Sequence, residues 1–481
     1  MRHGKFRIRQ RGLAIIVLVL TLLFGATAVF YRTTTATSPE IERERERKTA
    51  EALVMAKAAL IGYATSVNNF AGNERLGDLP CPDRNDSGSP GGTAATSCGN
   101  AAGNQQARRL GRLPWKTLGL PDLRDGDGER LWYAVSNNFK NNTRTACTVP
   151  GQTGCLNSDT RGTITVRDAF GTVINNGANL DPYTPSGVVA VIIAPGGVLS
   201  RQGAAAAQNR TCAGGACTTA GVCTTNPEST TPKCNPANYL DVVSGVEDNA
   251  DFTDNSATNG FINGVVRNSN GNVIVNDRLI TITYEDLMPK LEYRVAMETL
   301  NCLRSYATAA ANNGRYPWAN PANSASTNDQ ANTLFGQMSG TAPFLAGYLA
   351  NTTASAPSMP TSWTASCTLT QGSSSATWWN NWREHVFYAV ADVYKPGTSA
   401  PTGCTSASCL SVNPPSTAAN KQVVVLVAGK RLAGVAGGQP RSSLADKQNP
   451  ANYFEGNYTL PAFTKQPRST TFNDTVVFYP P

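Results

Sequence analysis

The sequence predicts an α+β protein in which one membrane-spanning helix precedes two copies of a unit, each with a helix packed on an antiparallel sheet. Three observations support this prediction. An uncharged apolar stretch runs from Leu13 to Tyr31. A helical pattern at 38–65 is followed by several short strand-like segments, an order typical of α+β folds. Finally, six sequence features of the first half recur in the same order in the second half.

The stretch 13–31 is long enough to cross a membrane. At 1.5 Å per residue it would extend about 28 Å as a helix, close to the thickness of a hydrocarbon core. The leader, residues 1–12, carries several basic residues and no acidic one, and such a flank stays in the cytoplasm. We therefore expect a single-pass protein whose remainder is exported. The alternative is a secretory signal peptide that is cleaved at the small residues Gly25-Ala26-Thr27-Ala28.

The exported part is close to neutral. The whole chain has a net charge of +8, and five of these charges come from Arg2, Lys5, Arg7, Arg9 and Arg11 of the leader. The remainder has no strong electrostatic footprint for nucleic acid, so we expect no nucleic-acid partner. Only 15% of the residues are charged, and the chain is rich in Asn, Thr, Ser and Gly, which indicates a loop-rich surface.

A second helix is expected to begin at Ser38. Ser38-Pro39-Glu40 combines a capping residue, a proline at the first helical position and an acid in the first turn. Further along, Leu53, Ala56, Leu60 and either Tyr63 or Ala64 follow helical spacing and would form the face that covers a sheet. Strands are predicted, from β-branched content and flanking turn residues, at Leu131–Val135, Thr163–Arg167, Val188–Ala194 and Leu279–Tyr284.

The internal repeat is the most specific signal in the chain. Tyr-Ala-Thr at 63–65 recurs at 306–308, and 125–135 aligns without gaps on 380–390. A cysteine pair follows each of the latter segments. The apolar run at 188–197 then corresponds to 423–432, Asn-Pro-Ala-Asn-Tyr occurs at both 235–239 and 449–453, and 276–284 resembles 473–479. The chain is therefore predicted to be a tandem duplication with domains at 38–286 and 287–481.

Twelve cysteines in an exported chain indicate disulfides formed in an oxidising compartment, most simply a bacterial periplasm. Zinc is the alternative, but the spacings lack the tight pairs of zinc modules. We expect local disulfides between Cys147 and Cys155 and between Cys404 and Cys409, which occupy equivalent loops. The disulfide candidates are Cys81, Cys98, Cys147, Cys155, Cys212, Cys217, Cys223, Cys234, Cys302, Cys367, Cys404 and Cys409.

The leader ends in Gln10-Arg11-Gly12, and the apolar stretch begins directly with Leu13. This junction resembles the prepilin signal of type IV pilins and type II secretion pseudopilins. The resemblance implies cleavage between Gly12 and Leu13, with the apolar helix retained in the inner membrane. The family usually has a glutamate at the fifth position after the cut, where this chain has Val17, so the sequence leaves open whether the leader is removed.

A second stretch carries the same resemblance. Residues 300–317 resemble the part of major pseudopilins in which an apolar helix ends in Asn-Gly-Arg-Tyr-Pro. Gly314 can adopt the left-handed conformation that ends a helix, and Pro317 prevents its continuation. Trp382 stands where the family has the tryptophan of an Asp-Pro-Trp-Gly turn. The resemblance implies a pilin-like fold, with other pilin or pseudopilin subunits and their assembly machinery as partners.

Residues typical of catalysis are sparse. His385 is the only histidine outside the leader, and no Gly-x-Ser-x-Gly motif accompanies it. We expect His385 to be a partly exposed residue at a strand edge, and we expect no enzymatic activity and no catalytic residue. Asp125, Asp127 and Glu129 could supply oxygens to calcium, but the distal glutamate of an EF-hand loop is missing, so a polar turn is favoured. No other metal or cofactor is expected.

Together these features predict a structural or accessory subunit of a type IV pilus or type II secretion pseudopilus system. It would be anchored in the bacterial inner membrane, with both domains in the periplasm and extraction into a filament as one outcome. The alternative is an anchored periplasmic or surface binding protein, such as an adhesin or a receptor for a glycan or a protein. Neither the particular system nor the partner follows from the sequence.

Overall fold

The structure is a computed structural model of the whole chain. It describes residues 38–66, 75–84, 91–96, 98–99, 109–140, 154–184, 186–203, 207–210, 235–317, 335–337, 381–395, 397–406, 408–433, 438–443, 446, 449–458 and 461–480. The leader, the stretch 13–31 and the proposed processing site at Gly12 and Leu13 lie outside these residues. Among the described residues, no helix combines the length and the apolar character needed to cross a bilayer.

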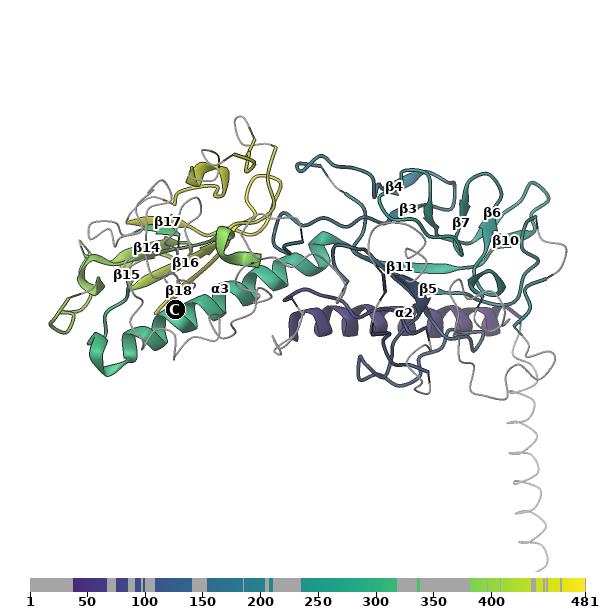
Figure 1. Cartoon of the computed structure of the whole chain (residues 1–481), viewed down its shortest axis with the longest axis horizontal. Coiled ribbons are helices and arrows are strands. Elements are labelled where there is room, and N and C mark those ends of the chain that lie inside the picture. The colour runs from purple at the N-terminus through teal and green to yellow at the C-terminus, as the bar shows by residue number, and fades with distance from the viewer. Residues whose placement is uncertain are drawn as a thin grey trace, which may run out of the picture.

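The predicted α+β class is confirmed, and the first unit shows its pattern (Figure 1). Helix α2 (Ser38–Ser66) packs on strands β5 and β11 of a four-stranded sheet with the order β1-β2-β5-β11. All neighbouring strands of this sheet are antiparallel. The strands are β1 (Leu110–Arg112), β2 (Trp132–Val135), β5 (Ala190–Ala194) and β11 (Arg278–Ile282).

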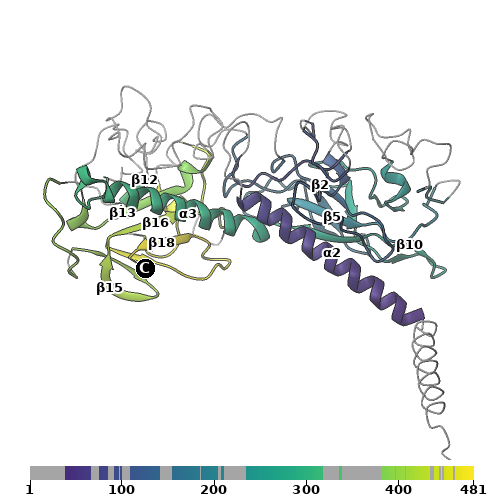
Figure 2. The same ribbon diagram turned by 90° about the horizontal axis from the view of Figure 1, so that it is seen from below.

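The second unit repeats this arrangement. Helix α3 (Tyr284–Thr308) packs on β16 and β18 of an antiparallel sheet with the order β12-β13-β16-β18. Figure 2 shows both helices along one side of the molecule, each against the sheet of its own unit. The strands are β12 (Phe335–Gln337), β13 (Val386–Val390), β16 (Val423–Val427) and β18 (Thr475–Tyr479).

Each unit also has a three-stranded side sheet of the same topology. The order is β4-β3-β8 in the first unit and β15-β14-β17 in the second, and each contains one antiparallel and one parallel pair. The first unit adds two short hairpins, β6–β7 and β9–β10. The strands are β3 (Thr165–Arg167), β4 (Val173–Asn175), β6 (Val242–Val243), β7 (Glu247–Asp248), β8 (Gly260–Ile262), β9 (Val266–Arg267), β10 (Val273–Val275), β14 (Leu410–Asn413), β15 (Ser416–Lys421) and β17 (Ala462–Thr464).

Equivalent turns fold alike in the two units. Asn-Pro-Ala-Asn-Tyr forms a 3-10 turn twice, η3 (Pro236–Asn238) and η9 (Pro450–Asn452), and in each an asparagine side chain caps the turn. Further 3-10 turns are η4 (Ala310–Asn312), η7 (Arg383–His385) and η8 (Asp392–Tyr394). The strand pairing differs by two residues from the sequence correspondence, which matched 188 with 423. Ala190 pairs with Val135 at the end of β2, and Val423 pairs with Val390 at the end of β13. In the structure, Ala190 therefore corresponds to Val423.

Three predicted strands contain the observed ones, but the fourth ends earlier than predicted. Strand β11 stops at Ile282, because Thr283 caps helix α3 and Tyr284 is already helical. The Thr283 hydroxyl accepts a hydrogen bond from the Asp286 amide, and the Asp286 carboxylate accepts one from the Thr283 amide at 2.8 Å. This reciprocal cap satisfies two backbone donors. It also leaves a single residue between the last strand of the first unit and the helix of the second.

One hydrophobic core runs through both units. The predicted face of α2 is buried, with Ala64 rather than Tyr63 as its last fully buried residue. The same cluster of buried residues includes α3, β2, β5, β13 and β16. At the boundary, Leu291 of α3 lies against Gly77 and Leu156 of the first unit, and a side chain at Gly77 would collide with it. Helix α3 therefore belongs to both units.

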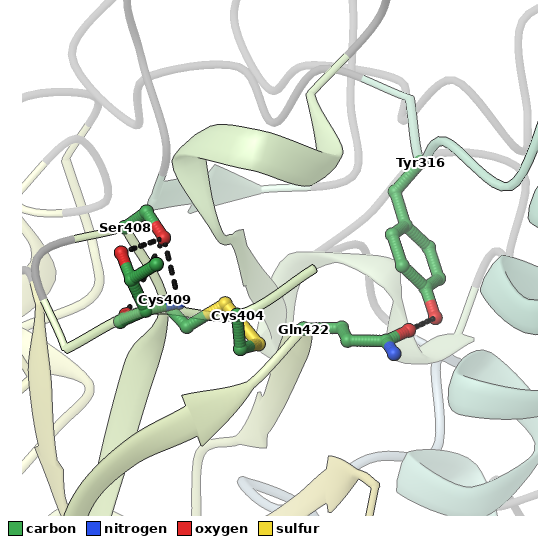
Figure 3. Close-up of a disulfide and its surroundings, with 6 residues drawn as sticks. Tyr316, Cys404, Ser408, Cys409 and Gln422 are labelled. Atoms are coloured by element: carbon green, nitrogen blue, oxygen red, sulfur yellow. Dashed lines mark hydrogen bonds between the residues drawn. A yellow bond between two sulfur atoms is a disulfide. The ribbon is translucent and has the colours of Figure 1, made fainter. Parts of the chain in front are cut away.

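The disulfide prediction is confirmed for the second copy. Cys404 and Cys409 are bonded and close a short loop before β14 (Figure 3), and Cys81 is bonded to Cys98 in the first unit. Cys155 and Cys302 also carry disulfide bonds. The remaining cysteines, Cys147, Cys212, Cys217, Cys223, Cys234 and Cys367, lie outside the described residues, so the Cys147–Cys155 pairing stays a prediction.

The shared core predicts that the two units unfold together. Leu291→Ala should destabilise the protein by about 2–5 kcal/mol, because it removes a fully buried side chain and leaves a cavity. Urea unfolding of the full-length chain should show one transition, shifted to lower urea. Tyr293→Ala, an exposed position on the same helix, is the control and should change stability little. Two transitions, with only one of them shifted, would contradict a shared core.

Candidate functional site at the junction of the two units

One of the contacts between the two units is made by a short loop of the first unit, residues 154–160. Asn157 shapes this loop: its side-chain oxygen accepts from the Asp159 amide at 3.0 Å, and its carbonyl accepts from the Thr160 amide at 2.9 Å. The Thr160 hydroxyl in turn accepts from the Asn157 amide at 3.0 Å. Such side-chain to backbone bonds fix a turn without help from a sheet. We call the contacts of this loop with the second unit the junction.

Asn381 of the second unit holds the loop in place. Its side-chain oxygen accepts from the Leu156 amide at 2.8 Å, and its carbonyl accepts from the Asn157 side-chain amide at 3.0 Å. All three residues are buried. A buried amide that lacks a hydrogen-bond partner costs free energy of folding. Moving the loop would break these bonds, so they hold it in one position.

The Asp159 carboxylate lies among three basic side chains of the second unit. Arg441 donates to Oδ1 at 3.0 Å, and Arg431 donates to Oδ2 through two nitrogens, each at 3.2 Å. The His385 Nε2 lies 3.4 Å from Oδ2. Arg441 is itself buried, so it depends on this carboxylate and on backbone carbonyls to balance its charge.

The surroundings of Asp159 favour its ionised form. Burial by itself raises the pKa of this carboxyl, but the charge of Arg441, the nearby His385 and the charge of Arg431 outweigh burial and lower the pKa. A lowered pKa in the folded protein means that the ion pair contributes its stability above the unfolded value, near 4. That contribution is lost only as the pH falls through the folded value, so the junction is intact at neutral pH.

A second buried ionic group lies beside the loop. Glu292 of α3 is fully buried, and Arg468 donates to its Oε2. The Tyr284 hydroxyl lies 3.2 Å from Glu292 Oε1 and donates to the carbonyl of Ser158 at 2.8 Å. Burial raises the pKa of Glu292 to about 7, although Arg468 and hydrogen bonds from Ser158, Arg468 and Tyr284 act in the opposite direction.

Comparison of the two units shows that the junction arginine has an acidic partner from the other unit. Arg210 and Arg441 occupy equivalent positions. Each donates from Nε to a carbonyl of the 3-10 turn and from Nη1 to the carbonyl of a glycine after the central strand. Their acidic partners differ. Arg210 lies 3.5 Å from Glu129 of its own unit, whereas Arg441 takes Asp159 from the other unit. The second unit thus depends on the first to balance this arginine.

The residues proposed for calcium form a polar turn. The Asp125 carboxylate accepts from the amides of Asp127 and Glu129 through Oδ1 and from the Gly196 amide through Oδ2. Asp127 pairs with Arg45, and Glu129 pairs with the arginine described above. Within the described part of the chain, no three His, Cys, Asp or Glu residues are grouped as metal ligands.

The expectation for His385 was wrong. The residue is only 1% exposed and ends a 3-10 turn immediately before β13, rather than lying partly exposed at a strand edge. Its ring meets the ring of Tyr453 edge-on at 5.9 Å, and one nitrogen faces Asp159. Trp382 is fully buried in the shared core, as expected of a packing residue.

Sequence reasoning missed Asp159, Asn381 and Glu292. A signal existed for Glu292, which lies on the apolar stripe of α3, one residue after Leu291. No local pattern marks Asp159 or Asn381, since their partners are more than two hundred residues away.

We compared the chain with protein-family models, with curated proteins and with solved structures, and none matched. Its function is therefore inferred from its own sequence and geometry.

The Asp159 contact predicts a measurable loss of stability. Asp159→Ala should destabilise the full-length chain by about 3 kcal/mol, since it leaves Arg441 buried without its carboxylate. Denaturant unfolding would measure this effect. Glu129→Ala removes the equivalent partner of Arg210 at a more exposed site, and it should cost less. Equal losses in the two variants would show that Asp159 has no special role.

Glu292 predicts a pH dependence. Because its folded pKa of about 7 lies above the unfolded value, Glu292 favours the folded state less as the pH rises. The contribution of Glu292 to the free energy of unfolding is complete below about pH 4.5. It decreases by about 3 kcal/mol as the pH rises to the folded pKa of about 7. Denaturant unfolding of the wild type and of Glu292→Gln at pH 5 and pH 8 should show a smaller loss in the variant. Parallel losses would exclude Glu292 as the source.

Proposed function

We propose that this chain is a membrane-anchored structural or accessory subunit of a type IV pilus or type II secretion pseudopilus system. The proposal rests on the order of the segments along the chain. A basic leader ending in Gly12 precedes an apolar stretch, and a helix packed on an antiparallel four-stranded sheet follows. Pilin-like subunits have this order of parts. In this proposal the apolar stretch anchors the protein in the inner membrane, and both units lie in the periplasm.

The shape of α2 supports the proposal. The helix begins at Ser38, seven residues after Tyr31. The residues of its first part, 39–48, are exposed, and Arg45 among them lies against Gly126 of the first unit. Figure 2 shows this end of α2 extending beyond the sheet of the first unit. A helix that leaves its sheet in this way can connect a membrane segment to a folded head. The shared core and the junction would then make that head one stiff body, as a structural subunit requires.

A partner-binding role is the second candidate, and one surface favours it. Between β3 and β4 the hairpin exposes Phe170 (93%), and Ile174 on the edge strand β4 is 59% exposed. The equivalent edge strand of the second unit, β15, reads Ser-Thr-Ala-Ala-Asn-Lys and is largely polar. Exposed apolar groups on an unpaired edge are typical of surfaces that bind another chain.

The N-terminus distinguishes a filament subunit from a released protein. If the leader is processed as in prepilins, mass spectrometry of the membrane-extracted protein should find a mature chain that begins at Leu13. An unprocessed chain would still have its anchor, but the resemblance to prepilins would then lose the support of cleavage after Gly12. A start just after Ala28 would mean that the anchor is lost, and the filament proposal would fail.

Assembly through the anchor can be tested directly. Replacing Leu18 and Leu22 with lysine should abolish co-purification with pilus or secretion components, because charges in the apolar stretch oppose helix packing in the membrane. Phe170→Ser with Ile174→Ser is the matched control and should leave co-purification unchanged. The reverse result, with loss only in the control, would favour the binding role.

A further inference from the structure

The hairpin of strands β3 and β4 presents apolar side chains to solvent. Phe170 at its tip is 93% exposed, Ile174 on β4 is 59% exposed and Val173 is 38% exposed. Val246 lies beside the tip, since a β-carbon added at Gly171 would be 3.1 Å from it, and it is exposed as well. Apolar side chains that gather on a surface are typical of a site that binds another chain.

The backbone beside these side chains is an open sheet edge. Strand β4 ends the sheet β4-β3-β8, and among the described residues no strand lies beyond it. Figure 1 shows the strand on the side of the first unit opposite α2. The unpaired backbone groups of an edge can bond an added strand. The ligand that suits this surface is therefore an extended segment, which can use both the edge and the apolar side chains.

This edge lacks the features that usually prevent pairing with another chain. Sheet edges are commonly protected by charged side chains, especially lysine, or by proline. From 169 to 180 the chain contains no charged residue and no proline. The equivalent strand of the second unit, β15, ends in Lys421 and follows Pro414 and Pro415. Of the two equivalent edges, β4 is therefore the one suited to an added strand.

An acidic residue stands at each end of this uncharged stretch, Asp168 before it and Asp181 after it. The Asp168 Oδ1 accepts from the amides of Phe170 and Thr172 at 2.9 Å each, and the Asp181 Oδ1 accepts from the Tyr183 amide at 3.0 Å. These bonds need an acceptor oxygen and not a negative charge, because an asparagine side chain offers the same oxygen.

The negative charge of these two carboxylates is not balanced by a neighbour. Among the described residues neither forms an ion pair, whereas Glu247 and Asp248, which follow Val246, are paired with Arg167 and Arg201. Positive charges at both ends of an added strand would complement this arrangement.

We propose that the β4 edge binds an extended segment of a partner protein that is apolar in its centre and carries lysine or arginine at both ends. The backbone of the segment pairs with β4, its apolar side chains cover Phe170 and Ile174, and its cations lie near Asp168 and Asp181. The proposal names the partner chemistry for the binding role described above, on which it rests, and does not depend on the filament role.

Peptide binding to the full-length protein in detergent tests the proposal. One fluorescent probe has a centre of alternating valine and threonine with lysines at both ends, and a second probe has glutamates in place of the lysines. The lysine peptide should bind about tenfold more tightly at low salt, and added salt should reduce this difference. When it binds, hydrogen exchange should slow in the segment that contains β4 and stay unchanged in β15.

Paired substitutions separate the charge from the apolar contact. Asp168→Asn with Asp181→Asn keeps the acceptor oxygens and removes both charges, so the preference for the lysine peptide should disappear. Phe170→Ser with Ile174→Ser should weaken binding of both peptides about tenfold, because the apolar contact is lost. Asp392→Asn, which removes an exposed acid of the second unit, is the control and should leave binding unchanged. Denaturant unfolding shows that each variant is folded.

Three outcomes would overturn the proposal. The first is that the glutamate peptide binds the wild type as tightly as the lysine peptide, or that Phe170→Ser with Ile174→Ser leaves binding unchanged. The second is a wild-type dimer in sedimentation that this double variant dissociates, since a second copy would then occupy the edge. The third is loss of a cellular partner in the double variant without binding of either peptide to the wild type, which would retain the binding role and reject the partner chemistry.

Discussion

The direct connection of β11 to α3 is the constraint on which the rest of the structure depends. A single residue, Thr283, separates the last strand of the first unit from the helix of the second, and a reciprocal cap fixes the direction in which that helix leaves. With no linker to bend, the first half of α3 must pack against the first unit. The common core follows from this, as does the position of loop 154–160 against the second unit.

The two units contain equivalent hydrogen-bond networks, and in the second unit the arginine of this network contacts the other unit. In both copies an arginine, a glutamine and a pair of acids hold the segment after the central strand. The first copy balances its arginine internally with Glu129. In the second copy Asp159 comes from outside, and Glu384, which aligns with Glu129, bonds Tyr453 instead. The acidic partner of the arginine therefore distinguishes the internal network from the contact between the units.

Sequence reasoning recovered what is local or repeated. Helix α2 and its buried face follow from spacing, and the equivalence of the two Asn-Pro-Ala-Asn-Tyr turns follows from identical residues. The end of β11 was misjudged because Thr283 has β propensity and also caps helices, and tertiary context chose the cap. The site could not be predicted in the same way. Asp159 and Arg441 meet across the two units, and the buried His385 has one nitrogen facing Asp159, so both contacts join residues that are far apart in the sequence.

The loop closed by Cys404 and Cys409 has a consequence for repetition. It corresponds to the loop that carries Asp159, and it lies before β14 as the other lies before β3. From 396 to 421, however, the sequence has no acidic residue. Another unit placed after the second would therefore find no carboxylate for its arginine. The contact that joins the two units therefore has no counterpart on the loop that Cys404 and Cys409 close.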